Sequence, residues 1–127
     1  PQAPVRPTNK VVPTMVSAAS VPLRPTPVGA AAVLLVTPEV SVNRLVLRAG
    51  ADVPAHDHPG VSEYLYIVSG NGALTVDGQT LELGPTHVVQ IPPGTMHQAK
   101  AVTDMVALQF YTPSGPEARY QANAATR

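Results

Sequence analysis

The chain has 127 residues, which is the length of one domain, and its hydrophobic content of 44% is enough for one core. Eight basic and eight acidic residues cancel to zero net charge, and no basic cluster or aromatic stacking surface is present, so a nucleic-acid partner is excluded. The longest apolar run, at 30–36, is far below the roughly twenty residues that cross a bilayer, and the lack of cysteine excludes disulfides and thiolate zinc sites.

The first segment, 1–32, is a proline-rich N-terminal extension. Its outermost part, 1–12, is expected to be a loosely extended tail. The apolar pieces VVPTMV and SVPL have a second interpretation, in which they add an edge strand to a second subunit. We therefore predict a homodimer. The start at Pro1 fits a cytoplasmic protein or an exported one whose signal has been removed, so the compartment stays open.

Short alternating apolar runs fill residues 33–113 and are typical of antiparallel strands. They lie at 44–48, 73–76, 80–84, 86–91 and 105–111. Asp77 and Gly78 separate two of these runs and favour the type I′ turn of a β-hairpin. The C-terminal tail, 114–127, is predicted to contain a short helix that opens at Ser114. The fold class is therefore predicted to be all-β, a small antiparallel barrel.

Three histidines and one glutamate are the candidate metal ligands. If the segment containing His56 and His58 is extended, both imidazoles project from one face, because side chains alternate along a strand. An intervening turn lets Glu63 return to the same cavity from the next strand, and His97 follows the turn formers at 92–94. Imidazoles with one carboxylate favour a divalent transition metal over calcium or magnesium.

The spacing resembles the first motif of the cupin superfamily, G(X)5HXH(X)3,4E(X)6G. Every fixed position is matched, by Gly50, His56, His58, Glu63 and Gly70. The second motif, G(X)5PXG(X)2H(X)3N, is matched at Pro92, Gly94 and His97, but Thr86 and Ala101 replace its glycine and asparagine.

The resemblance implies a cupin barrel over residues 33–113, which is a double-stranded β-helix of jelly-roll type. It also implies one divalent transition metal per chain. Iron or manganese is favoured, and nickel, copper and zinc are alternatives. The implied ligands are His56, His58, Glu63 and His97. The fourth histidine, His87, lies outside both motifs and is expected to be a surface or hydrogen-bonded residue.

The polar groups of the pocket depend on the last predicted strand, whose phase stays open. One face carries Gln109 and Tyr111, and the other carries Val106 and Leu108. With the first face inward, Gln109 is a polar group near the metal and Tyr111 a proton donor; with it outward, both lie at a dimer contact. Alternation from Glu63 predicts an aliphatic pocket. Two other amides are candidates for orienting an imidazole, Gln90 and Gln98.

Two classes of function follow. In the first, the protein is a metal-dependent enzyme, a dioxygenase, decarboxylase or isomerase, and a small carboxylate, enol or diol substrate binds at an open coordination position. In the second, the same barrel senses or stores a small ligand or a metal without chemistry. The sequence places no second carboxylate, lysine or nucleophilic serine near the motifs, so the metal and its bound water are expected to carry most of the acid and base chemistry.

Overall fold

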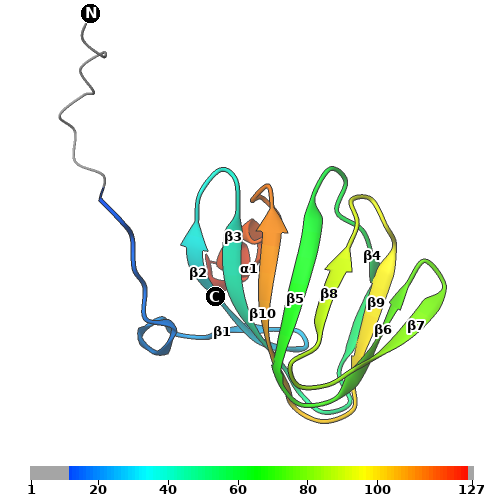
Figure 1. Ribbon diagram of the computed structural model, residues 1–127. Helices are drawn as coiled ribbons and strands as arrows, with labels where there is room; N and C mark the ends of the chain where they lie inside the picture. The colour runs from blue at the N-terminus through cyan, green and yellow to red at the C-terminus, as the bar shows by residue number, and fades with distance from the viewer. Residues whose placement is uncertain (1–11, 126–127) are drawn as a thin grey trace, which may run out of the picture.

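The computed structural model describes residues 12–125, in which two antiparallel β-sheets face each other (Figure 1). Before the first strand lies a short 3-10 helix, η1 (Ala18–Ser20). The strands are β1 (Arg24–Thr26), β2 (Gly29–Val36), β3 (Ser41–Leu47), β4 (Asp52–His56), β5 (Ser62–Ser69), β6 (Gly72–Val76), β7 (Gln79–Leu83), β8 (Val88–Ile91), β9 (His97–Ala101) and β10 (Met105–Thr112). The helix α1 (Ala118–Ala125) follows them. The all-β prediction is confirmed.

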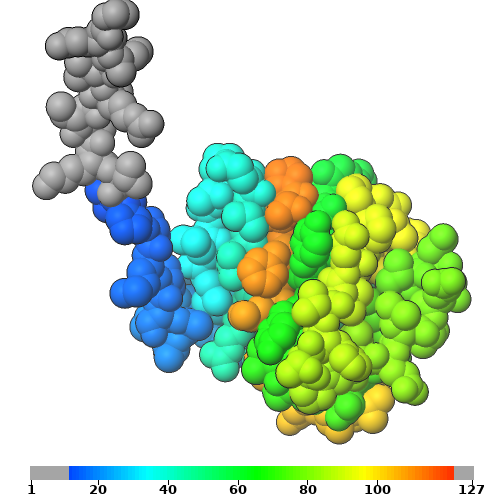
Figure 2. Space-filling model, viewed as in Figure 1, coloured from blue at the N-terminus to red at the C-terminus, as the bar shows by residue number. Residues whose placement is uncertain are grey.

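The chain passes repeatedly between the two sheets. One sheet has six strands in the order β1-β2-β3-β10-β5-β8, and the other has four in the order β4-β9-β6-β7. Figure 2 shows part of the larger sheet, with β10 in orange between β3 in cyan and β5 in green. Because β4 and β9 belong to one sheet and β5 and β10 to the other, residues from the predicted motifs face each other across the barrel. In residues 12–125 no helix is long and apolar enough to cross a membrane.

Local turn chemistry explains where several strands begin and end. Asp77 and Gly78 have φ angles of 48° and 80° and join β6 to β7 in the predicted two-residue hairpin. The run predicted at 86–91 is shorter in the structure and begins at Val88. The reason is a turn, in which Thr86 has a φ of 71° and the His87 N–H donates to the Gly84 carbonyl.

The sheet begins earlier than the predicted boundary at residue 33. Strand β1 pairs with β2, which itself starts at Gly29. A side chain at Gly29 would meet the Val46 carbonyl of β3, so this early pairing requires glycine. The two apolar pieces expected to pair with a second subunit precede β1, and none of their described residues lies in a strand. Of the tail predicted over 1–12, residues 1–11 lie outside the described residues, and Val12 is exposed.

The C-terminal helix begins later than predicted, at Ala118 instead of Ser114. The Ser114 N–H donates to the Pro38 carbonyl, and Gly115 has a φ of 155°, which is not helical. The Gly115 N–H is satisfied by the Glu117 carboxylate, which lies just before the first turn of α1. These contacts fix where α1 begins, and this N-terminal end of the helix reaches the barrel's interior.

The core is aliphatic, as predicted, and is built from the inward faces of both sheets. Alternate residues of β10 are buried along its whole length, so the face carrying Gln109 and Tyr111 points inward. This settles the phase that the sequence left open. The buried apolar cluster consists of Leu65, Ile67, Leu74, Leu83, Ile91, Ala101, Met105 and Ala107.

Candidate metal centre

The four predicted ligands lie together between the two sheets. His56 ends β4 and is paired with His97 at the start of β9, while His58 follows β4 and Glu63 projects from β5. One donor atom from each of the four residues lies within 4.8 Å of the donors of the other three. Glu63 and His97 are each only 5% exposed. Residues from both motifs therefore form one group that can hold a metal ion, with Glu63 and His97 buried and His56 and His58 half-buried.

Three of these donor atoms converge without hydrogen-bond partners. Glu63 Oε1 lies 3.5 Å from His58 Nε2 and 3.3 Å from His97 Nε2, and all three atoms are buried and unsatisfied. Buried polar atoms are normally paired, because leaving one unpaired costs about 1–3 kcal/mol. A cation bound among these atoms would satisfy all three. The set of nitrogen donors with one carboxylate fits a divalent transition metal.

Backbone carbonyls define the tautomers of two histidines. His56 Nδ1 lies 2.8 Å from the Pro54 carbonyl oxygen, and His97 Nδ1 lies 2.9 Å from the Thr95 carbonyl oxygen. A carbonyl only accepts, so each Nδ1 carries a proton, and the lone pair of the neutral ring is on Nε2. This is how metal-binding histidines are usually oriented.

The glutamines proposed to orient the imidazoles do not do so. Gln90 contacts Tyr64, with 3.5 Å between Gln90 Nε2 and Tyr64 Oη, and Gln98 is exposed on β9. Their side chains alternate away from the interior, which the sequence pattern did not reveal. His87 lies outside the group, as expected, and its Nδ1 accepts a hydrogen bond from the Gly84 N–H.

Burial and charge separate the pKa values of the group. Burial lowers the pKa of His58 to about 4 and holds the pKa of His56 below its usual value. Burial also opposes charge on Glu63 and His97. However, the contact between Glu63 and His97, the hydrogen bond from Gln109 to Glu63 and the hydrogen bond from His97 to Thr95 outweigh the effect of burial. The pKa of Glu63 is therefore lowered, and the pKa of His97 is raised. Without a cation, Glu63 therefore favours its charged form and His97 its protonated form.

A chain of hydrogen bonds holds the Glu63 carboxylate. Gln109 Nε2 donates to Glu63 Oε2 at 2.7 Å, and Gln109 Oε1 accepts from the Tyr120 hydroxyl at 2.9 Å. Arg119 Nη2 donates to the Tyr120 hydroxyl at 2.9 Å. Glu63 Oε2 is thereby occupied, which leaves Oε1 facing the histidines. Arg119 and Tyr120 were missed by the sequence analysis, because they follow the last strand and belong to neither motif.

Tyr111 packs against His58, one of the four predicted ligands. It is fully buried, and its ring centroid lies 5.1 Å from that of His58, with 69° between the ring planes. Its hydroxyl accepts a hydrogen bond from Arg119 Nη2 at 2.9 Å. Burial and the nearby Glu63 charge raise the pKa of Tyr111, which keeps the phenol neutral. Tyr111 does not line the cavity. Its position thus fits orientation of His58 better than the proton donation to a ligand that the sequence suggested.

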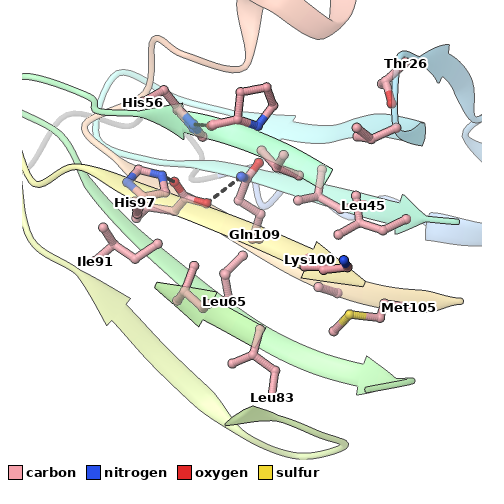
Figure 3. Close-up of a pocket in the computed structure, with 18 of the residues that line it drawn as sticks. Thr26, Leu45, His56, Leu65, Leu83, Ile91, His97, Lys100, Met105 and Gln109 are labelled. Atoms are coloured by element: carbon pink, nitrogen blue, oxygen red, sulfur yellow. Dashed lines mark hydrogen bonds and ion pairs between the residues drawn. The ribbon is translucent and has the colours of Figure 1, made fainter. Parts of the chain in front are cut away.

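The centre opens into a cavity of about 450 Å³ between the sheets, a size typical of small-molecule sites. In Figure 3, His56 and His97 lie at one end, and Met105, Lys100 and Thr26 lie towards the other. Lys100 thus reaches the lining, although the sequence placed no lysine near the motifs. As predicted, the walls are aliphatic; they include Leu45, Leu47, Val53, Leu65, Ile67, Leu74, Leu83, Ile91, Ala99 and Ala107.

Residues 43–112 match the family model of the cupin domain. The chain belongs to the cupin family. The match contains all four predicted ligands and ends before α1, so Arg119 and Tyr120 of this cupin lie outside it. No match was found among curated proteins.

Solved structures similar to this cupin agree on the fold. KdgF from Halomonas sp. has a TM-score of 0.79 and 19% identity, covering 84% of this chain and 99% of its own. An RmlC-like cupin from Shewanella frigidimarina has a TM-score of 0.75 and 20% identity, covering 81% and 93%. A protein described as a predicted oxalate decarboxylase, from Thermotoga maritima, has a TM-score of 0.72 and 22% identity, covering 80% and 100%.

Proposed function

We propose that this cupin holds one divalent transition metal per chain through His56, His58, Glu63 and His97 and acts as a metal-dependent enzyme on a small carboxylate, enol or diol. The observation that carries the proposal is the convergence of three buried, unpartnered donor atoms, two of which belong to residues that line a ligand-sized cavity, Glu63 and His97. Iron(II) or manganese is preferred, because both accept five or six ligands and keep positions open beside four protein donors. Nickel, copper and zinc are the alternatives.

When bound, the metal supplies Lewis-acid polarisation of a substrate oxygen or access to dioxygen. The chain's own residues provide the surroundings. Gln109 fixes the Glu63 carboxylate, and the backbone carbonyls of Pro54 and Thr95 fix His56 and His97. The mostly aliphatic walls give a bound substrate apolar surroundings.

The lining favours a dioxygenase or a decarboxylase over an isomerase. Among residues 12–125, Glu63 is the only carboxylate that lines the cavity, and it is a proposed ligand. Isomerisation by proton transfer needs a general base within hydrogen-bond reach of the substrate. Two other titratable side chains at the metal end are not proposed ligands. Arg119 stays protonated, and the Tyr120 hydroxyl already donates its hydrogen to Gln109. The reaction is therefore proposed to depend on the metal more than on protein acids and bases.

The test is elemental analysis of protein purified without a histidine tag, together with His97→Ala and the matched control His87→Ala. Near one iron or manganese per chain is expected in the original protein and in the control, with loss in His97→Ala. Equal metal content in all three would overturn the ligand assignment. A zinc-filled centre without exchangeable water would instead favour the non-catalytic binding or sensing role.

A further inference from the structure

Arg119 is an exposed residue that also lines the cavity. It is the second residue of α1, and its Nη2 donates to the hydroxyls of Tyr111 and Tyr120, both at 2.9 Å. Its guanidinium carbon also lies 4.9 Å from the centroid of the Tyr120 ring. These contacts restrict a side chain that is otherwise flexible, so its charge has a defined position at the cavity.

The charge of Arg119 has no carboxylate partner. Both ion pairs found in residues 12–125 join Glu63 to histidines, and neither involves an arginine. A guanidinium has five N–H donors, and the two hydrogen bonds of Arg119 both use Nη2. Within the described residues, the N–H groups of Nε and Nη1 therefore donate to no protein group. Each of these N–H groups can donate a charge-assisted hydrogen bond to a carboxylate oxygen.

The rest of the lining selects against polar ligands. Away from the end that carries the histidines, Glu63, Gln109 and Arg119, the walls are nearly all aliphatic. A hydroxyl buried against them would lose its water without gaining a partner. An apolar group would instead gain by leaving water.

We propose that Arg119 is a specificity-determining residue that binds the carboxylate of a small acid whose remainder is apolar and occupies the aliphatic cavity. This inference rests on the proposed function, since it names the substrate class of the same site. It assigns carboxylate recognition to the C-terminal helix, outside both metal-binding motifs. It also disfavours sugar acids as ligands.

Calorimetric titration with three six-carbon probes tests the proposal on the protein as purified. Hexanoate is expected to bind about tenfold or more tightly than hexanamide, which lacks the charge, and than gluconate, which keeps the carboxylate but adds hydroxyls. Arg119→Gln should remove the preference for hexanoate over hexanamide. Two matched controls should keep it: Arg44→Gln on β3, outside the lining, and Lys100→Gln, which removes the cation at the other part of the cavity.

Three results would overturn the proposal: an unchanged hexanoate preference in Arg119→Gln, loss of that preference in Lys100→Gln instead, or equal binding of gluconate. If Arg119→Gln does not fold, NMR of the arginine Nε–H signal in the unsubstituted protein decides. The Arg119 signal is expected to shift with hexanoate but not hexanamide, and an unmoved signal refutes the contact. Metal content separates the two proposals: a metal-free protein that binds hexanoate through Arg119 contradicts the proposed function alone.

Discussion

Gln109 links the C-terminal helix to the metal centre, and replacing it with leucine tests that link. The side chain is 2% exposed and makes two hydrogen bonds, to Glu63 and from Tyr120. Gln109→Leu leaves a buried carboxylate oxygen and a buried hydroxyl without these partners. Each such loss costs about 1–3 kcal/mol, and more for a charged group. We expect the free energy of unfolding to fall by about 2–5 kcal/mol.

The same change should weaken metal binding by about tenfold to a hundredfold, because Glu63 would no longer be held with Oε1 towards the histidines. Urea denaturation of the metal-free protein measures the first effect, and competition with a chelator measures the second. The matched control is Gln90→Leu, whose side chain is exposed. Adding Tyr120→Phe to Gln109→Leu should recover only part of the stability. It removes the hydroxyl whose hydrogen has lost its acceptor, but it also removes one acceptor of Arg119. Losses in Gln109→Leu no larger than in the control would refute the role of this hydrogen-bond chain.

Two more predictions concern pH and assembly. Because the pKa of His97 is raised by its contacts with Glu63 and Thr95, a proton competes with the metal below that pKa. Metal affinity should therefore rise about tenfold per pH unit up to the pKa of His97 and level off above that pKa. Calorimetric titration in buffers of different ionisation enthalpy should show proton release on metal binding. A metal affinity independent of pH would contradict this prediction. Homodimerisation stays a prediction, supported by the exposed Val12 and Met15; sedimentation equilibrium should give twice the 13.2 kDa chain mass, and a single-chain mass would refute it.

Features encoded by neighbouring residues were predictable from the sequence. The hairpin at Asp77 and Gly78 depends on two positive φ angles, which these residue types adopt at low cost. The inward direction of Leu65 and Ile67 follows from alternation along one strand. The histidine pair at 56 and 58 likewise needs only an extended backbone to present both rings to one point.

The strand boundaries, the phase of β10 and the strand pairing could be found only in the tertiary structure. The phase of β10 could not be read from periodicity, because Val106, Leu108 and Phe110 are as apolar as several residues of the buried face. The early start of the sheet depends on β1 folding back on β2, and β2 on Gly29 fitting against β3. Neither pairing is visible in one segment taken alone.

The sequence by itself determined the fold class and which four residues can bind a metal, because the spacing within the two motifs identifies them although they come from β4, β5, β9 and the segment after β4. Only the tertiary structure decided what surrounds them. Gln109 reaches Glu63 across paired strands, and Arg119 and Tyr120 arrive on a helix more than fifty positions later in the chain than Glu63. Such contacts are set by how the sheets and helix pack, and packing leaves no periodic signature in the sequence.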